Sequence, residues 1–149
     1  MKRIRVSHLF ASVLVAFLAV LLLTHCSTGP QAIKKEEERE ALRGRIEEYW
    51  KYRIDGKVDK AYQCELPEFR DRVNLLEYAQ RFKVVRYLEA EILEIDIKEL
   101  EAQSVMKLTY VYMLKKLTGK KIPAQEVEQW RRVKGVWYHL PESVKAETK

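Results

Sequence analysis

The apolar residues of this 149-residue chain change their spacing once, close to Val84. Before that point they recur every three or four residues, which is the period of an amphipathic helix. After it they alternate with polar residues, which is the period of a strand with one buried face. Helices followed by a run of strands indicate an α+β domain. We therefore expect N-terminal helices packed on a four-stranded antiparallel sheet.

The helical half predicts one long helix and two short ones. The long helix is expected over 34–55, where the larger apolar side chains form a single stripe, and Gly56 can end it in the left-handed conformation. A second helix is expected over 58–66. A third begins after Asn74, which forms the pattern of a capping box with Glu77.

The strand half begins with two apolar sets of opposite parity over 84–97, which meet at Ile92 and Leu93. A straight strand cannot bury both sets on one face, so we expect a bulge there. Further strands are expected over 104–114 and 122–133. Because a bulge bends its strand, the predicted sheet is strongly curved and cone-like.

The last strand pair closes around Lys134-Gly135, which we interpret as a two-residue hairpin loop. This loop pairs Val133 with Val136 and Trp130 with His139. We expect the face richer in valine and leucine to point toward the helices, and it carries Val127, Gln129, Arg131, Val133, Val136, Tyr138 and Leu140. The face expected to point outward carries Glu126, Glu128, Trp130, Arg132, Trp137 and His139. Reversing the two faces would make Glu126 and Glu128 pocket carboxylates.

The N-terminus has the layout of an export signal over 1–25, with a short cationic start and an apolar stretch over 6–23. Leu23-Thr24-His25-Cys26 resembles the lipobox of bacterial lipoproteins, in which the cysteine is acylated, although His25 stands where that pattern has a small residue. We expect a lipid such as palmitate on Cys26; an uncleaved membrane anchor and ordinary cleaved secretion are the alternatives. Each places the domain outside the cytoplasm.

The expected organisation is a signal peptide or anchor at 1–25, a tether at 26–35, an α+β domain at 36–141 and a flexible tail at 142–149. The expected location is the cell envelope of a bacterium, attached to a membrane by the N-terminal lipid or apolar segment. Under the lipoprotein interpretation, Ser27 resembles the residue that follows the cysteine in proteins sent to the outer membrane. In a diderm cell we therefore expect the outer membrane over the inner one.

The formal net charge of +6 does not indicate a nucleic-acid partner. Three of the 28 basic residues, Lys2, Arg3 and Arg5, precede the apolar segment. The other 25 are interleaved with 22 acidic residues, without the basic stripe that nucleic-acid binding needs. No HExxH, CxxC or glycine-rich phosphate motif occurs, and His139 is the single histidine after Cys26. We expect no metal, no nucleotide and no other cofactor.

The order of the expected elements and the closing W-x(4)-G-x-W-Y segment (Trp130, Gly135, Trp137 and Tyr138) resemble the nuclear transport factor 2-like superfamily. The resemblance covers 36–141 and implies a cone in which a sheet wraps round helices. That superfamily includes SnoaL-like and ketosteroid isomerase-like enzymes as well as non-catalytic ligand-binding or dimerising modules. The fold alone does not choose between these functions.

Our first functional hypothesis is a non-enzymatic lipoprotein that binds an apolar or amphipathic small ligand, or an envelope protein. The expected pocket lining is Tyr62, Tyr110, Tyr112, Gln129, Arg131 and Tyr138. The alternative is an enzyme of the SnoaL-like or isomerase-like type that uses a pocket carboxylate as acid or base. Asp55 and Asp59 supply that residue type, and Glu126 and Glu128 would do so with reversed hairpin faces. A third hypothesis is a homodimer formed through an outward face that carries Trp130, Arg132, Trp137 and His139.

Overall fold

The computed structural model describes residues 30–113 and 119–141. The chain divides into two compact units, Met1–Lys35 and Glu36–Lys149. The described part of the first unit, 30–35, forms the beginning of a helix. The predicted signal peptide, the predicted lipidation of Cys26 and the predicted tail at 142–149 all fall outside the described residues. Within the described ranges, no helix combines the length and apolarity needed to cross a membrane.

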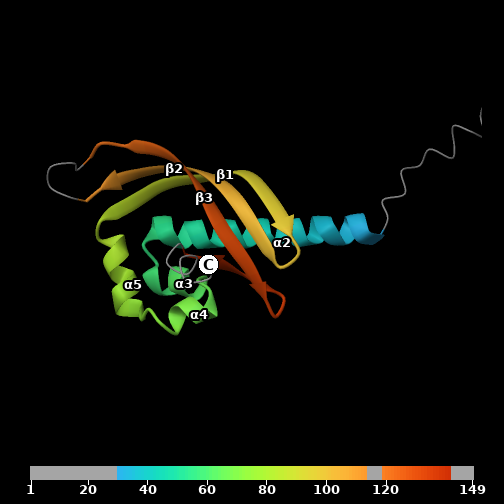
Figure 1. Ribbon diagram of the computed structural model, residues 1–149. Coiled ribbons are helices and arrows are strands. Elements are labelled where there is room, and N and C mark those ends of the chain that lie inside the picture. Colours follow the sequence, from blue (N-terminus) through green and yellow to red (C-terminus); the bar gives the residue numbers. More distant parts are fainter. Residues whose placement is uncertain (1–29, 114–118, 142–149) are drawn as a thin grey trace, which may run out of the picture. The chain divides into compact units, whose positions relative to one another are not determined.

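The long helix is α2 (Pro30–Asp55) (Figure 1). Its burial pattern confirms the predicted apolar stripe. Leu42, Ile46, Tyr49 and Trp50 are buried along one face. Gly56 follows with a φ of +70°, in the left-handed region that favours glycine, and ends the helix as expected.

Three short helices follow: α3 (Val58–Gln63), α4 (Pro67–Arg70) and α5 (Leu75–Phe82). The capping box of α5 is confirmed, because the Glu77 backbone N–H donates to Asn74 Oδ1 at 3.0 Å and the Asn74 N–H donates to Glu77 Oε2 at 3.2 Å. The single turn of α4 was not expected. It begins at Pro67, which suits the first position of a helix because that position needs no N–H partner.

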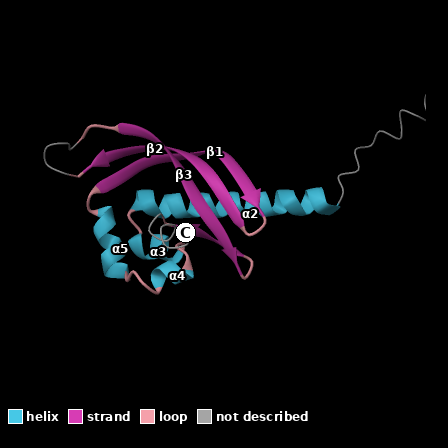
Figure 2. Ribbon diagram, viewed as in Figure 1, coloured by secondary structure: helices cyan, strands magenta, loops and turns pink. Residues whose placement is uncertain are grey.

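The strands are β1 (Val85–Lys98), β2 (Glu101–Tyr112), β3 (Ile122–Val133) and β4 (Val136–Leu140). They form one antiparallel sheet in the order β1-β2-β3-β4, so each strand pairs with the next one along the chain. Figure 2 shows β1 and β2 on one side of α2, β3 crossing the helix, and the short helices gathered at one end. The α+β class and the four-stranded antiparallel sheet are as predicted.

The bulge predicted near Ile92 and Leu93 is present, and a second register shift lies between Tyr87 and Glu89. Leu93 is 48% exposed, so Ile92 and Ile95 both face inward on either side of it. The expected strong curvature is wrong, because the sheet is not strongly curled. Both bulges bend the edge strand β1 locally, whereas β2 and β3 pair without a register shift.

The hairpin register is confirmed, since Val133 pairs with Val136 and Trp130 with His139. Both loop residues have positive φ, 49° at Lys134 and 85° at Gly135. Positive φ at both central residues is the signature of a type I′ turn, whose twist matches that of the flanking strands.

The expected orientation of the same hairpin is wrong. Trp130 and Trp137 are 1% and 3% exposed, whereas Val127 and Val136 on the opposite face are 52% and 44% exposed. Counting valine and leucine is a poor guide here, because a buried tryptophan removes more apolar surface from water than a valine does. The Trp130 indole N–H also has a buried partner, donating to Ser104 Oγ at 3.0 Å.

The hydrophobic core lies between this inner face and the helices. Its largest fully buried apolar side chains are Trp130, Tyr49, Phe69, Leu42, Ile46, Leu66, Met106 and Leu108.

Candidate functional site

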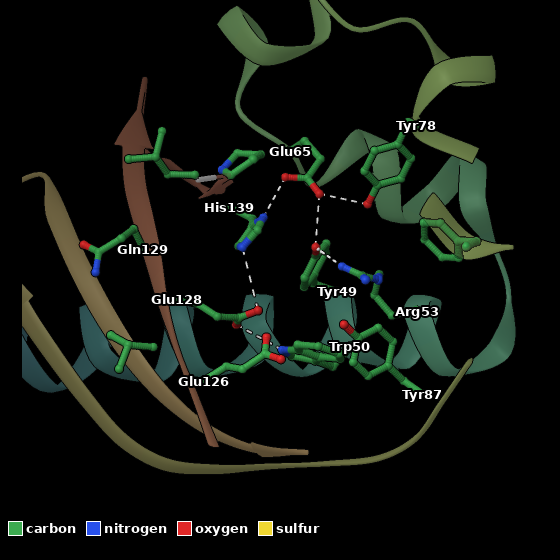
Figure 3. Close-up of a pocket in the computed structure, with 14 residues that line it drawn as sticks. Tyr49, Trp50, Arg53, Glu65, Tyr78, Tyr87, Glu126, Glu128, Gln129 and His139 are labelled. Atoms are coloured by element: carbon green, nitrogen blue, oxygen red, sulfur yellow. Dashed lines mark hydrogen bonds and ion pairs between the residues drawn. The ribbon is translucent and has the colours of Figure 1, made fainter. Parts of the chain in front are cut away.

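A pocket of about 760 Å³ opens beside the inner face of β3 and β4 (Figure 3). Its walls combine aromatic side chains with charged ones, contributed by α2, the segment between α3 and α4, α5 and three strands. The lining residues are Tyr49, Trp50, Arg53, Glu65, Tyr78, Phe82, Tyr87, Glu126, Val127, Glu128, Gln129, His139, Leu140 and Pro141.

Backbone hydrogen bonds fix the position of Glu65 opposite β4. The Leu66 N–H donates to the His139 carbonyl at 2.9 Å, and the His139 N–H donates to the Cys64 carbonyl at 2.9 Å. These bonds form a short parallel bridge between Glu65 and His139. Glu65 therefore extends the sheet by one residue beyond β4, in the parallel direction.

The Glu65 carboxylate is 1% exposed and accepts three hydrogen bonds. Its Oε1 accepts from the Tyr49 hydroxyl at 3.0 Å and from the Tyr78 hydroxyl at 2.8 Å, and its Oε2 lies 2.7 Å from His139 Nδ1. Burial alone would raise the pKa of Glu65, but the His139 ring and the Tyr78 hydroxyl hold it below its usual value. Glu65 is therefore a buried carboxylate in its charged form.

The His139 ring lies between two carboxylates. Its Nδ1 faces Glu65, and its Nε2 lies 3.7 Å from Glu128 Oε1. The ring also stacks on Tyr49, with centroids 4.7 Å apart and planes 21° apart. Burial acts to lower the pKa of His139, but the contact with Glu65 and the proximity of Glu128 raise it above its usual value. With both nitrogens facing carboxylates, the imidazolium form fits this position.

Glu128 is buried, and its Oε2 accepts from Trp50 Nε1 at 3.0 Å and from Ser104 Oγ at 3.5 Å. Burial raises the pKa of Glu128, and the nearby Glu126 adds to the increase. The three side chains Glu65, His139 and Glu128 form one polar chain across the pocket wall (Figure 3), which we call the carboxylate–imidazole chain.

Arg53 lies on the other side of Tyr49 from this chain. Its Nη1 donates to the Tyr49 hydroxyl at 2.6 Å, and its buried Nε has no hydrogen-bond partner among the described residues. Tyr49 thus connects the guanidinium to Glu65 through one hydroxyl.

The site differs from the predicted pocket lining. Of the six expected residues, Gln129 lines the pocket, and the other five do not. Tyr62 donates to the Arg70 and Val73 carbonyls, at 3.0 and 2.7 Å. Tyr110 and Tyr112 pack edge to face at the far end of β2, with centroids 5.6 Å apart.

The remaining two expected lining residues lie on the face of the hairpin opposite Trp130 and His139. Arg131 pairs with Glu101 at 3.0 Å. Tyr138 lies under the guanidinium groups of Arg45 and Arg70, 5.8 and 6.0 Å from their central carbons. These positions follow directly from the reversed orientation of the hairpin faces.

The residues expected on an outward interface lie on the inner face instead. Trp130 and Trp137 are core, His139 belongs to the carboxylate–imidazole chain, and Arg132 pairs with Glu38 of α2 at 2.7 Å. The homodimer hypothesis rested on two exposed tryptophans, and neither is exposed.

The predicted lining omitted Tyr49, Arg53, Glu65, Tyr78 and Tyr87. Glu65 carried a signal, because it stands between the apolar Cys64 and Leu66, two residues before Pro67. An acid flanked by two buried apolar residues is itself buried only with partners. Its partner His139, however, lies 74 positions away, and a single sequence gives no indication of that pairing.

No three His, Cys, Asp or Glu side chains of the described residues are placed to hold a metal ion. The site places fixed charged groups beside aromatic side chains. Glu65 is charged, has donors on both oxygens and orients His139. Glu128, Glu126 and Arg53 line the open volume. Such a wall can hold a small ligand in one orientation.

No family model matches the chain, and no curated protein matches it. Solved structures do. A SEC-C motif-containing protein from Rhodopseudomonas palustris matches with a TM-score of 0.52 at 19% identity, over 81% of this chain and 82% of its own. The fold is the nuclear transport factor 2-like α+β fold.

Two further structures share this fold. A SEC-C motif-containing protein from Psychrobacter arcticus matches with a TM-score of 0.56 at 14% identity, over 70% of this chain and 60% of its own. A candidate calcium/calmodulin-dependent kinase II association domain from Exiguobacterium sibiricum matches with a TM-score of 0.50 at 12% identity, over 69% of this chain and 88% of its own. At sequence identities this low, the similarity shows a shared fold alone.

Proposed function

We propose that this protein is an exported, membrane-anchored lipoprotein whose nuclear transport factor 2-like domain binds a small ligand without converting it. The observation that supports this most strongly is the pocket of about 760 Å³ with the carboxylate–imidazole chain built into its wall. Ligand pockets typically have volumes of roughly 300–1,000 Å³ and combine apolar walls with a few fixed polar groups. The pocket beside β3 and β4 fits that description.

The bonding of the buried groups favours binding over acid–base chemistry. A general base needs a free lone pair directed at the substrate. Glu65 does not present one, because its side chain is buried and both of its oxygens already accept from Tyr49, Tyr78 or His139. His139 in turn is held on both nitrogens and stacked on Tyr49.

A second candidate function is an enzyme that uses Glu128 as its acid or base. It is favoured by one observation: burial raises the pKa of Glu128, whose side chain lines the open pocket. Raised carboxylate pKa values serve proton transfer near neutral pH. The two functions are separated by incubating the protein with small molecules extracted from the cells that make it and analysing them by mass spectrometry. Conversion that Glu128→Gln abolishes would favour the enzyme.

The proposed location rests on the N-terminal sequence. Mass spectrometry of the membrane fraction should find an acylated Cys26 as the first residue. An intact Met1 would favour the uncleaved anchor, and an unacylated terminus near residue 26 in the soluble fraction would favour cleaved secretion.

Binding can be tested with 4-phenylbutan-1-ol as a neutral amphipathic probe. Isothermal titration would use the full chain in lipid nanodiscs, with empty nanodiscs subtracted for partitioning of the probe into lipid. The critical variant is Glu126→Trp, because Glu126 lines the pocket and makes no hydrogen bond or ion pair within the described part of the chain. The matched control is Gln125→Trp, the adjacent exposed residue on the opposite face of β3.

Saturable binding to the wild type is expected, with affinity at least roughly tenfold lower in E126W because an indole occupies the pocket. The Q125W control should bind like the wild type. Equal affinities of E126W and the wild type would show that the probe does not enter this pocket.

A further inference from the structure

Arg53 is the cationic side chain of the pocket whose bonding is incomplete among the described residues. It projects from α2 into the pocket wall (Figure 3) and is mostly buried. Within the described residues it forms no ion pair, and its buried Nε lacks a hydrogen-bond partner. Buried charges in folded proteins are ordinarily paired, and each unpartnered buried donor is destabilising.

Aromatic rings surround the guanidinium. Its central carbon lies 4.8 Å from the ring centroid of Tyr87, 5.0 Å from Phe82, 5.3 Å from Trp50 and 5.5 Å from Tyr49. Contacts at these distances are cation–π interactions, which hold the planar group in place. The Tyr49 and Tyr87 hydroxyls supply neutral acceptors to the same group, and neither supplies a negative charge. The ring cluster therefore fixes the orientation of Arg53 while leaving hydrogen-bonding capacity unused.

The carboxylates of the pocket do not supply the missing acceptor. Glu65 and Glu128 lie on either side of His139, and the contact between Arg53 and Glu65 is indirect, through the Tyr49 hydroxyl. Glu128 uses one oxygen for Trp50 and Ser104. Of the two cationic side chains that line the pocket, His139 is thus paired with carboxylates and Arg53 is not.

We infer that the ligand is a small amphipathic monoanion whose carboxylate is bound by Arg53 and whose apolar body lies among Phe82, Tyr87 and Trp50. This rests on the proposed function and deepens it. The guanidinium fork matches a carboxylate in geometry and charge, and an Arg–carboxylate hydrogen bond is among the strong ones. A single negative charge suits the site, because Glu126 and Glu128 on the facing strand repel a second one.

Three probes that share one apolar body and differ in the head group test this inference. They are 4-phenylbutyrate, the neutral 4-phenylbutan-1-ol and the cationic 4-phenylbutylamine, titrated into the full chain in nanodiscs. The critical variant is Arg53→Met, which keeps an unbranched apolar side chain against the rings. The matched control is Lys51→Met, an exposed cation two residues earlier on the same helix.

The wild type should bind the carboxylate most tightly. Loss of a charge-assisted hydrogen bond should weaken carboxylate binding by roughly tenfold to a hundredfold in R53M, while alcohol binding changes little and K51M behaves like the wild type. Equal binding of all three probes, or equal loss of alcohol and carboxylate binding in R53M, would overturn the anion inference and leave the pocket as a binding site. Preference for the amine would assign recognition to Glu126 and Glu128 instead. Binding of none of the three contradicts the proposed function itself.

Discussion

His139 Nδ1 lies 2.7 Å from Glu65 Oε2, and the backbones of the same two residues are joined as a parallel bridge. Side chain and main chain together tie β4 to the segment between α3 and α4. The pocket therefore has a wall whose charged groups are positioned by the fold before any ligand arrives. Preorganised polar groups of this kind lower the cost of ordering a bound ligand.

Glu65→Gln should be strongly destabilising. The amide cannot accept from two hydroxyls and an imidazolium at once, so it leaves buried donors unsatisfied. Breaking a buried ion pair costs about 3–5 kcal/mol, and we expect a loss in that range in urea unfolding of the full chain. Glu94 lies at an exposed position of β1. The free energy of unfolding of Glu94→Gln should therefore stay within about 0.5 kcal/mol of the wild-type value. Similar losses in both variants would contradict the role of Glu65.

The stability that His139 contributes should decrease with rising pH. Its pKa is raised in the folded state, so its contribution is complete below the unfolded value of about 6.5 and is lost as the pH rises through the higher folded value. Unfolding free energies of the wild type and His139→Gln should therefore differ most below neutral pH and converge above the folded pKa. A difference that stays constant from pH 6 to pH 9 would argue against the imidazolium form.

The orientation of the β3–β4 hairpin can be tested through two positions on opposite faces of β3. Trp130→Ala removes a fully buried side chain and should cost about 3–5 kcal/mol. Val127→Ala, at a position 52% exposed, should cost well below that, about 0.5 kcal/mol. The denaturation midpoints of the two variants give the comparison, and a larger loss in V127A would reverse the faces.

Lys134 is the weak position of the hairpin turn. Its φ of 49° is unfavourable for lysine, whereas asparagine tolerates the left-handed region and Asn-Gly is the preferred type I′ pair. Lys134→Asn should stabilise the protein by up to about 1 kcal/mol, and Lys134→Ala should not. Thermal unfolding of the two variants measures this; equal midpoints would mean that the turn does not limit stability.

Local patterns in the sequence predict much of the fold. The stripe on α2, the capping box at Asn74, the bulge after Ile92 and the hairpin register all depend on residues close together in the chain, where helical period, strand parity and turn geometry apply directly. The strong curl was not found, because a bulge predicts a local bend and not the shape of a whole sheet.

The site could not be predicted in the same way. Strand parity separates the two faces of the hairpin but does not say which face is buried. The buried face is the one whose polar groups find partners, such as Ser104 for Trp130 and Trp50 for Glu128. Those partners are fixed by packing between distant segments. Strand parity does predict that reversed faces make Glu126 and Glu128 pocket carboxylates, and both line the pocket.

The most direct test of ligand binding in this pocket uses the three tryptophans of the chain as position-specific reporters. Trp50 lines the pocket and donates to Glu128 at 3.0 Å, whereas Trp137 is buried away from it. With 5-fluorotryptophan in the full chain in nanodiscs, titration with 4-phenylbutan-1-ol should shift the Trp50 fluorine resonance saturably and leave that of Trp137 in place. A Trp50 resonance that does not move at saturating probe would contradict the assignment of this pocket as the ligand site.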